Sequence, residues 1–574
     1  MPEIKPRDVQ VASIGAADTT VLRSRTWDRL KFEVEYSLQR GTTANSYLIQ
    51  ADKTALLDPP GESFTEIFLN QLQQCINVQE LDYIILGHVN PNRTVTLKGL
   101  LDLAPQVTFI CSKSGAVGLR TAFPDQELNI WVARGDETID LGRGHQLQFI
   151  PIPTPRWPDG LCTYDRATRI LFTDKLFGAH VCGDSIFDEN WKALDEDRHY
   201  YYDCLHAAQC RQVEAALDKL ASLSAKFYAP GHGPIVRYSI SRLTHDYRQW
   251  GQQQAEKEMT VALIYASAYG NTATLAQAIA KGITKTGVAV ESINCEFAEP
   301  TEIEAAIEKC DGFIIGSPTL GGHMPTQVQT ALGIVLSTAA KTKLAGVFGS
   351  YGWSGEAVDE IETKLKDAGY NLGFEPIRVK FKPNDATLQY CKEVGTDFAQ
   401  ALKKSKKLRA PKQPVSTSQI DRTEQAVGRI VGSLCVLAAQ RENVTSGMLA
   451  SWVTQASFNP PGLTVAIAKD RAVESLTHTG DKFVLNILQE GKNIRRHFLK
   501  PFAPGENRFA GLNVQEAENS CPILTDALAY LECTVNSRMD CGDHWLVYAV
   551  VDNGKVLQST GITAVHQRKS GSHY

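Results

Sequence analysis

One stretch, "VALIYASAYGNTATLAQAIAKGITKTG" at 261–287, constrains the fold more than any other. Its opening run "VALIY" is apolar at every position, as expected for a strand that helices cover on both faces. A turn rich in small hydroxyl and amide side chains, "SAYGNT" (267–272), then leads into a helical pattern. This order predicts a doubly wound parallel sheet with the turn at a helix N-terminus.

The turn places Ser267, Tyr269, Gly270, Asn271 and Thr272 at the start of the expected helix. Backbone N–H groups and the positive end of the helix dipole favour an anion there. The turn contains no Lys, unlike the loops that bind nucleoside triphosphates. A monophosphate held by hydroxyls and backbone donors is therefore the better fit.

Two further strands end in glycine-rich loops, in "GFIIGSPTLGGHMP" (312–325) and "LAGVFGSYGWSGEA" (344–357). Glycines let the backbone approach a flat ligand, and aromatic rings can stack on it. All three loops follow the carboxyl ends of strands, where open α/β sheets bind ligands. With the strand signals "VAVESINC" and "PIRVKF", the pattern predicts a five-stranded domain. The candidate contacts in these two loops are Pro318, Thr319, Leu320, Gly321, Gly322, Ser350, Tyr351, Gly352, Trp353 and Gly355.

The three loops resemble those of the flavodoxins, which bind FMN. "SAYGNT", "SPTLGG" and "SYGWSG" match that family's phosphate loop and its two flanking loops. The resemblance covers the whole domain and implies FMN as its cofactor. The plainer alternative is a glycine-rich doubly wound domain without a ligand.

The chain has 574 residues, enough for three or four domains. Two polar stretches, 248–259 and 403–419, break the apolar patterns. The second, "KKSKKLRAPKQPVSTSQ", is basic and rich in Ser and Thr, so we interpret it as a solvated linker rather than a binding patch. The predicted organisation is a domain at 1–255, a domain at 256–405, a linker at 406–419 and a domain at 420–574.

Charge and composition exclude several classes of partner. Lys and Arg number 59 and Asp and Glu number 64, and this net charge of −5 argues against nucleic acid. The N-terminus "MPEIKPRDVQ" has no apolar core and no apolar run reaches the length of a membrane span, so neither a secretory signal nor membrane insertion is expected. The 13 Cys form no CxxC pair, which predicts reduced thiols in a cytoplasmic protein.

The first domain carries the frame of a metal site without its ligands. Residues 41–60 predict two short strands with Asp58 at a strand end, "LDYIILGHVNPNR" (81–93) follows, and "FYAPGHGPIVR" (227–237) closes the domain. This order resembles the metallo-β-lactamase fold, an αββα sandwich. Joined to a flavodoxin-like domain, it resembles the flavodiiron proteins. That resemblance implies two irons held by a His-x-Glu-x-Asp-His loop, a distant His, a bridging Asp and a final His.

Laid on this chain residue by residue, the motif keeps a ligand type at only two positions. In chain order, His88 falls on the first His, Asn90 on the Glu, Asn92 on the Asp, Arg93 on the second His, Arg156 on the distant His, Lys175 on the bridging Asp and His232 on the final His. Arg stays protonated in proteins, and Lys ligates only after losing its proton. At about 4 Å and an effective dielectric of about 20, each like-charge pair costs about 4 kcal/mol. A metal is therefore not expected.

Three interpretations of this degenerate pocket stay open. It is a pocket kept for packing and dimer formation, an anion-binding or regulatory site, or a hydrolase with unusual ligands. Zinc hydrolysis needs at least three neutral or anionic ligands, which disfavours the last. Asp159 and Asp174 are expected to offset part of the positive charge as ion pairs, so internal salt bridges either close the pocket or leave room for an anion. For His88 and His232 we expect hydrogen-bonding roles.

The third domain alternates apolar and polar residues in "GRIVGSLCVLAAQRENVTSGMLASWVTQASFNPPGLTVAIAK" (428–469), which predicts a β-barrel. "WLVYAVVDNGKVLQ" (545–558) predicts a hairpin at its Asp-Asn-Gly turn. The domain resembles the flavin reductases, split β-barrels that bind FMN or FAD and accept hydride from NAD(P)H. "CGDHWLVYAVV" (541–551) resembles that family's Gly-Asp-His segment, which implies that His544 lies near the nicotinamide.

The candidate contacts of this second flavin are Ser451, Trp452, Gln455 and Ser457. The simpler alternative places Trp452 in the core and the polar side chains in solvent. Neither the choice between FMN and FAD nor the choice between NADH and NADPH follows from the sequence.

The order of the three domains resembles the flavodiiron proteins of oxygenic phototrophs. Membership implies electron flow from NAD(P)H through the reductase flavin to FMN and then to di-iron, with O2 reduced to water. That family forms head-to-tail dimers, in which the FMN of one subunit faces the metal site of the other. The expected role is the electron-delivering subunit of an NAD(P)H:oxygen oxidoreductase, paired with an iron-bearing paralogous subunit or with itself. The alternatives are a stand-alone NAD(P)H:flavin oxidoreductase and a non-catalytic, regulatory flavin-binding partner.

Overall fold

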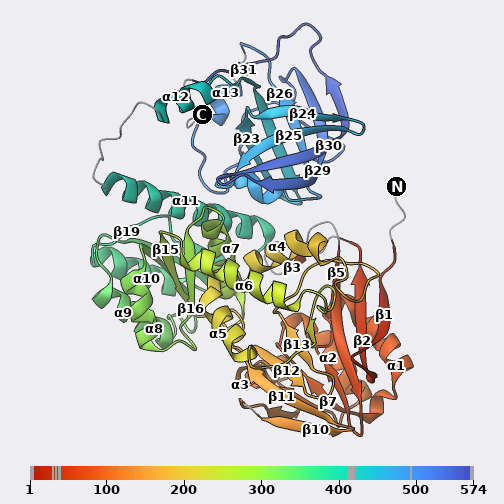
Figure 1. Ribbon diagram of the computed structural model, residues 1–574. Helices are drawn as coiled ribbons and strands as arrows, with labels where there is room; N and C mark the ends of the chain where they lie inside the picture. Colours follow the sequence, from red (N-terminus) through yellow and green to blue (C-terminus); the bar gives the residue numbers. More distant parts are fainter. Residues whose placement is uncertain are drawn as a thin grey trace. The chain divides into compact units, whose positions relative to one another are not determined.

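The structure is a computed structural model that describes residues 5–28, 31–32, 35–36, 41–135, 137–409, 420–491 and 494–568. The chain divides into two compact units (Figure 1). One consists of Met1–Glu258 with Ala289–Glu302, and the other of Met259–Val288 with Ile303–Tyr574. Among the described residues, no helix is long and apolar enough to cross a membrane.

The N-terminal domain packs two sheets face to face. The first sheet has the order β1 (Asp8–Ile14), β2 (Ala16–Thr26), β5 (Thr42–Gln50), β6 (Thr54–Leu57), β7 (Leu81–Ile85), β8 (Thr108–Cys111) and β9 (Asn129–Val132). The second has the order β10 (Thr138–Gly142), β11 (His145–Pro151), β12 (Leu161–Asp165), β13 (Ile170–Asp174) and β14 (Phe227–Pro230). Tyr47 and Ile49 of the first sheet pack with Phe149 and Phe172 of the second in the apolar layer between them.

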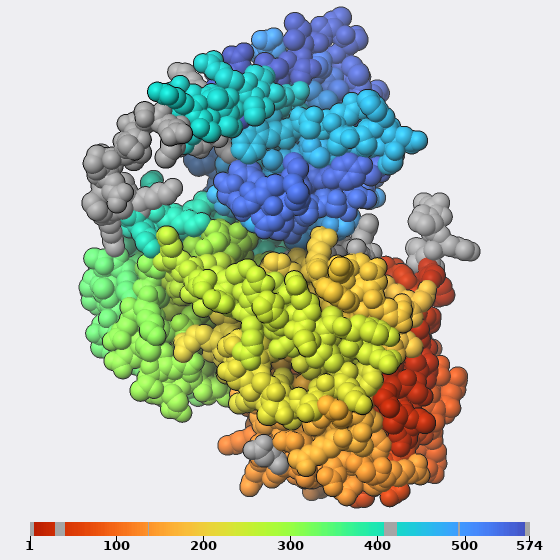
Figure 2. Space-filling view, viewed as in Figure 1, coloured from red at the N-terminus to blue at the C-terminus, as the bar shows by residue number. Residues whose placement is uncertain are grey.

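Helices cover both outer faces, so the predicted αββα sandwich is confirmed. On the first sheet lie α1 (Thr65–Cys75), α2 (Thr94–Leu103) and α3 (Lys113–Ala122), which bury residues such as Phe68 and Leu97. On the second lie α4 (Asp195–Leu205), α5 (Cys210–Leu220) and α6 (Ile240–Ala255). Figure 2 shows α5 and α6, in yellow and yellow-green, as a continuous layer on this side of the unit. A short hairpin of β3 (Lys31–Phe32) and β4 (Glu35–Tyr36) lies outside both sheets.

One buried histidine ties the two sheets together. His145 on β11 places Nδ1 2.9 Å from Asp165 Oδ2 on β12 and Nε2 3.2 Å from Asp18 Oδ2 on β2. Asp165 is fully buried, so this ring is a hydrogen-bond partner for a carboxylate that water does not reach.

We predict that His145→Ala lowers the free energy of unfolding of this unit by about 1–3 kcal/mol, because the buried Asp165 carboxylate loses one hydrogen bond and keeps only those from Ala167 and Thr168. Chemical denaturation of the full chain measures the loss. The matched control is Asp52→Ala, which removes the exposed Arg143–Asp52 pair of the same sandwich and should change the same quantity by less than ~1 kcal/mol. Equal effects for the two variants would contradict the assignment.

The middle domain is the expected doubly wound sheet. Its order is β16 (Ala289–Asn294), β15 (Thr260–Tyr265), β17 (Gly312–Pro318), β18 (Leu344–Tyr351) and β19 (Asn371–Leu372), and β20 (Ile377–Lys380) also pairs with β18. The helices are α7 (Asn271–Thr284), α8 (Pro300–Lys309), α9 (Thr326–Thr338), α10 (Glu356–Asp367) and α11 (Asp385–Arg409). The structure has six strands where five were predicted, because Pro376, which has no N–H, interrupts the last strand between β19 and β20.

Helix α11 is longer than the sequence pattern indicated. It runs to Arg409, so residues 403–409 are helical although the pattern placed them in the linker stretch. Lys, Leu and Arg are good helix formers, so the charged run extends the helix instead of ending it. The rest of the predicted linker, residues 410–419, lies outside the described residues.

The C-terminal domain is an antiparallel sheet that curls into an open barrel (Figure 1). After α12 (Ile420–Val427), its strand order is β23 (Val444–Ala450), β22 (Cys435–Arg441), β26 (Lys482–Ile487), β29 (Ala529–Asp540), β30 (His544–Val556), β25 (Pro461–Ala468) and β24 (Val453–Phe458). The edge strands β23 and β24 are consecutive in the chain, so the barrel is split where the chain passes from one to the other. Smaller pieces are α13 (Ile494–Phe498), the pair β21 (Gly432–Ser433) and β31 (Val565–His566), and the pair β27 (Val514–Glu516) and β28 (Pro522–Leu524).

The predicted hairpin at Asp552-Asn553-Gly554 is wrong. β30 continues through these residues, and the turn into it lies earlier, between β29 and β30. The register shifts between Glu532 and Cys533, which leaves Asp552 as the extra residue of a bulge. Its carboxylate accepts a hydrogen bond from Thr534 Oγ1 at 2.6 Å. The turn-forming residues therefore bend a strand instead of ending it.

Candidate functional site

The three candidate flavin loops lie at one edge of the middle domain. Strands β15, β17 and β18 are parallel neighbours, with Tyr265 paired to Gly316 and Pro318 paired to Ser350. Their carboxyl ends therefore meet, and the loops that follow carry the predicted residues. The second loop turns back on itself, since Leu320 and His323 exchange backbone hydrogen bonds at 2.9 and 3.1 Å.

Hydroxyl groups hold the first loop and line its surroundings. Ser267 Oγ accepts a hydrogen bond from Ala273 N at 3.0 Å, and Thr272 Oγ1 lies 2.8 Å from Ser350 Oγ. Gly270 precedes α7 with φ of +80°, which favours glycine. Thr319 Oγ1 is buried and has no hydrogen-bond partner in the part of the chain that the structure describes. A buried orphan hydroxyl at a ligand edge is the expected sign of a group that completes the site.

Two aromatic side chains stand in the open beside these loops. Tyr269 is 77% exposed and Trp353 is 92% exposed, unusual for rings of this size. Gly321 and Gly322 have φ of +59° and +86°, and no atom lies within 4 Å of a Cβ built on either. The remaining predicted residues close the edge: Asn271 opens α7, Tyr351 ends β18, and Gly352 leads to Gly355 at the N-terminus of α10. The arrangement fits a flat, phosphate-bearing ligand such as FMN.

In the N-terminal domain, Arg93 occupies the centre of the degenerate pocket. Its Nη1 donates to Asp58 Oδ1 at 3.1 Å and to the carbonyl of His88 at 2.9 Å, and its Nη2 donates to Asp174 Oδ1 at 2.9 Å. The side chains of all three charged residues are less than a tenth exposed. Salt bridges thus close this part of the pocket, one of the two outcomes expected for the positive charge.

The surrounding charges shift the titration of both carboxyl groups. Burial opposes ionisation of Asp174, but Lys175 and Arg93 outweigh it and hold the pKa of Asp174 below its ordinary value. Burial and the neighbouring Asp174 raise the pKa of Asp58 to about 6, against the pull of Arg93. Burial also lowers the pKa of Lys175. No hydrogen bond or ion pair of Lys175 Nζ occurs within the described residues, so the anion expected in this pocket stays a prediction for that amine.

The two histidines at matched ligand positions, His88 and His232, have the hydrogen-bonding roles predicted for them. His88 Nδ1 lies 2.8 Å from Asp159 Oδ1, and that carboxylate also accepts from Val89 N at 2.7 Å. His232 Nδ1 donates to the carbonyl of Thr43 at 2.7 Å. Burial beside Lys175 lowers the pKa of His232 to about 3, so it is neutral.

The other matched positions also serve the fold. Asn90 Oδ1 accepts from Asn92 N at 3.1 Å and caps a short 3₁₀ turn, Pro91–Arg93. Arg156 Nη1 donates to the carbonyl of Cys204 at 2.9 Å, and its guanidinium lies 4.8 Å from the ring centroid of Trp157. The side chains of Asn90 and Arg156 are therefore held by protein atoms.

These residues do not fit two irons. The guanidinium of Arg93 stands at a matched ligand position and pairs with the only acidic side chains beside it in the described pocket, Asp58 and Asp174, and Lys175 adds a second positive charge. Within the described ranges, no group of three or more His, Cys, Asp or Glu is placed to hold a metal ion. Positive charge fixed in the pocket opposes a dication by several kcal/mol per contact, about 4 kcal/mol at about 4 Å.

Sequence reasoning missed part of this pocket. It did not pair Asp58 with Arg93, and it did not single out His206, whose Nε2 donates to the carbonyl of Lys175 at 3.0 Å. A signal was present, since Asp58 directly follows the apolar strand β6 and Asp174 ends the apolar strand β13. Strand-end aspartates in this sandwich point at the pocket.

In the C-terminal domain, the structure brings together only some of the predicted flavin contacts. The rings of Trp452 and His544 lie 4.9 Å apart, and His544 Nδ1 donates to Asp543 Oδ1 at 2.8 Å. Ser451 is buried with its Oγ 3.1 Å from His566 Nδ1. Gln455 and Ser457 instead lie further along β24, where Ser457 Oγ donates to the carbonyl of Pro460 at 2.8 Å.

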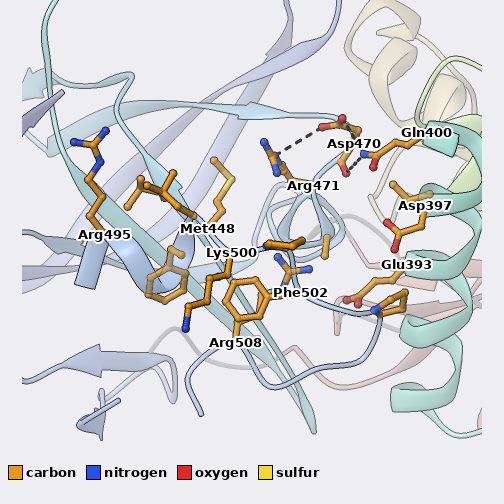
Figure 3. A pocket seen from close by; sticks show the side chains of 18 of the residues that line it. Glu393, Asp397, Gln400, Met448, Asp470, Arg471, Arg495, Lys500, Phe502 and Arg508 are labelled. Carbon is orange, nitrogen blue, oxygen red and sulfur yellow. Dashed lines mark hydrogen bonds and ion pairs between the residues drawn. The ribbon is translucent and has the colours of Figure 1, made fainter. Parts of the chain in front are cut away.

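A cavity of about 800 Å3 opens beside Ser451 (Figure 3). Its walls include Met448, Phe502 and His566, together with basic side chains that the sequence analysis did not identify, namely Arg471, Arg495, Lys500 and Arg508. Such a volume is ordinary for a small-molecule site. Basic residues scattered over several loops leave no local motif, which is why the pattern did not reveal them.

Three family models match the chain. They are "ODP family beta lactamase" over residues 42–233, "Flavodoxin" over 263–395 and "Flavin reductase like domain" over 427–571. A protein of Nostoc sp. (strain PCC 7120 / SAG 25.82 / UTEX 2576), with the provisional name diflavin flavoprotein A 6, is 66% identical over 576 residues and is covered in full, as is this chain. Diflavin flavoprotein A 1 of Synechocystis sp. (strain ATCC 27184 / PCC 6803 / Kazusa) is 44% identical over 577 residues, across 100% of this chain and 99% of its own.

One solved structure is also similar at the level of sequence and fold. The metal-soaked Flv1 flavodiiron core from Synechocystis sp. PCC6803 is 63% identical and has a TM-score of 0.67. The match covers 70% of this chain and 100% of that one.

The buried histidines of the pocket predict a pH dependence. Burial lowers the pKa of His206 to about 3. Between this value and the ordinary value of about 6.5, the unfolded chain binds a proton that the folded chain does not. Stability should therefore fall with pH from 7 towards 4, by up to about 1.4 kcal/mol per pH unit for this residue. Denaturation followed by tryptophan fluorescence at several pH values measures the slope.

His206→Gln should reduce the slope of the free energy of unfolding against pH by the contribution of one proton. His245→Gln, on the exposed side of α6, should leave that slope unchanged. An unchanged slope in the His206 variant would show that this ring titrates normally in the folded protein.

Proposed function

We propose an electron-delivering role for this chain, which belongs to the diflavin flavoprotein family of flavodiiron proteins. The family and its domains establish flavin-mediated electron transfer of the oxidoreductase kind. Our proposal is finer: the chain takes electrons from NAD(P)H in the cytoplasm and passes them towards O2, which is reduced to water on the di-iron site of a paralogous subunit. The observation that carries it is the ion-paired Arg93 at a matched ligand position, in a chain that keeps both flavin sites.

The flavodoxin-like loops supply the residues for FMN. Backbone N–H groups at the start of α7, with the hydroxyls of Ser267 and Thr272, would bind the phosphate. Tyr269 and Trp353 would cover the ring system from its two sides, which explains their exposure in the chain alone. When bound, flavins convert the electron pair of a hydride into single electrons.

The reductase-like domain supplies the residues for the nicotinamide nucleotide and the second flavin, FMN or FAD. Asp543 accepts from Nδ1 of His544 and so orients the ring beside Trp452. Because Asp543 holds one edge of the His544 ring, the opposite edge keeps a constant direction. That edge would position NAD(P)H. Ser451 lines the adjoining cavity, where the basic side chains favour a phosphate.

A subunit without its own iron site still serves in a hetero-oligomer. The flavodiiron resemblance implies head-to-tail dimers, so the FMN of this chain would face the metal site of a partner. The pocket around Arg93 would then stabilise the dimer and carry no redox step. The resemblance to a Synechocystis flavodiiron core over 70% of the chain supports the domain arrangement that such a dimer needs.

We predict that Trp353→Ala weakens FMN binding by about tenfold, because a stacked ring contributes about 1–3 kcal/mol. Tyr269→Ala should act in the same direction. Quenching of flavin fluorescence on titration into the flavin-free full chain measures Kd. Tyr238→Ala, which removes an exposed aromatic ring of the N-terminal domain, is the control and should leave Kd unchanged. Tight FMN binding by the double variant would mean that the flavin lies elsewhere.

The functional test is NAD(P)H-dependent O2 uptake with and without a paralogous subunit that carries all the iron ligands. We predict that the mixture consumes O2 much faster than the sum of its parts, and that His544→Ala in this chain abolishes the stimulation. High O2 uptake by this chain alone would favour a stand-alone flavin oxidoreductase. No flavin reduction by either nucleotide would favour a regulatory partner.

A further inference from the structure

Helix α11 forms one wall of the reductase cavity, although it is the last helix of the flavodoxin-like domain. Its contributions recur at helical spacing along one face, at Glu393, Thr396, Asp397, Gln400, Ala401 and Lys404. The opposite wall carries Arg471, Arg495, Lys500 and Arg508. In Figure 3 the carboxylates of Glu393 and Asp397 project from α11 towards the cavity. Two carboxylates of α11, on a face that ends in Lys404, therefore lie opposite four cations of the reductase-like domain.

Glu393 anchors this wall to the reductase backbone. The side chain is 8% exposed, and its Oε2 accepts a hydrogen bond from Gly505 N at 2.7 Å. Gly505 has φ of +73°, which favours glycine, so a fixed turn presents this N–H. Because the acceptor is charged, the bond is about twice as strong as a neutral one. A second contact, from Gln400 Nε2 to Asp470 Oδ2 at 3.0 Å, lies further along the same face.

Arg508 is the cavity cation nearest in sequence to this anchor, three residues beyond Gly505. Its guanidinium makes no hydrogen bond or ion pair with any residue that the structure describes, and it lies 5.2 Å from the ring centroid of Phe502. Burial lowers the pKa of Arg508, while Glu393 and Asp397 act in the opposite direction. On the same wall, Arg471 reaches only its neighbour Asp470, at 3.9 Å. Guanidinium groups that lack a close carboxylate partner are able to bind phosphate through two hydrogen bonds.

We propose that α11 is a removable wall, released when a phosphate-bearing nucleotide binds the cavity. The phosphate binds Arg471, which otherwise reaches Asp470, and Arg508, which lines the same cavity as the carboxylates of Glu393 and Asp397. Its negative charge then repels those carboxylates, and the Glu393–Gly505 bond weakens. Loading the reductase thereby frees the flavodoxin-like domain to move, which couples the two halves of the electron path. The proposal rests on the proposed function for the presence of a nucleotide in this cavity.

Hydrogen–deuterium exchange of the full chain tests the coupling, read at α11 and at the Gly505 amide. The flavin-free chain is compared with the chain after addition of FMN, of riboflavin, which has no phosphate, or of NADPH. We expect FMN, NADPH or both to protect the segment around Arg508 and to speed exchange at Gly505 by about tenfold, equivalent to about 1.4 kcal/mol. Riboflavin should not speed it. The FMN and NADPH arms identify which nucleotide supplies the phosphate.

Two variants fix the mechanism. Glu393→Gln should speed exchange at Gly505 without any ligand, and Arg508→Gln should abolish the ligand-induced increase. Glu360→Gln on α10, which removes an exposed carboxylate of the same domain outside the cavity, should do neither.

Three results would overturn the proposal. They are slower exchange at α11 when the nucleotide binds, protection at Arg508 with no change at α11, and no protection at Arg508 by any phosphate. The oxygen-uptake assay is read separately, so stimulation by the paralogous subunit would stand even if α11 proved to be a fixed wall.

Discussion

The guanidinium of Arg93, held between the carboxylates of Asp58 and Asp174, decides what the N-terminal domain can do. Arg93 and Lys175 balance the two carboxylates, so the pocket reaches local neutrality without a metal. A dication placed there would have to displace the guanidinium and leave it buried without a partner, which is the most costly outcome for such a group. The sandwich thus keeps the shape of a metal domain while the charge within it opposes a metal.

The pocket around Arg93 and the flavin loops are both built from residues at the ends of strands. Asp58 directly follows β6 and Asp174 ends β13, and both meet Arg93 in the pocket. Strands β15, β17 and β18 lead into the loops that would bind FMN. Residues at strand ends are positioned by a rigid sheet but are free to vary in type. The ligand types have been replaced in one domain, while the other keeps its hydroxyls, glycines and exposed rings. In the function proposed above, this difference separates an electron-delivering subunit from an iron-bearing one.

The sequence predicted those structural elements that depend on residues close together in the chain. The parallel sheet and the barrel could be predicted because each has its own period of apolar residues and its own turn signals, whereas the sandwich was predicted from a resemblance to a known fold. Local rules failed where tertiary context overrides them. The Asp552-Asn553-Gly554 segment bends β30 as a bulge because its cross-strand partners continue past it, and the lysines after residue 402 extend α11. The ion pairs of Arg93 and the basic wall of the reductase cavity join residues far apart in the chain, so no short motif announces them.

The most direct test of this account is the iron content of the pure full-length chain after incubation with ferrous iron and removal of the excess, measured by elemental analysis against protein concentration. Exclusion by the Arg93 ion pairs predicts only trace iron in the native chain. Two tightly bound irons in each chain, at the pocket where Arg93 meets Asp58 and Asp174, would contradict it.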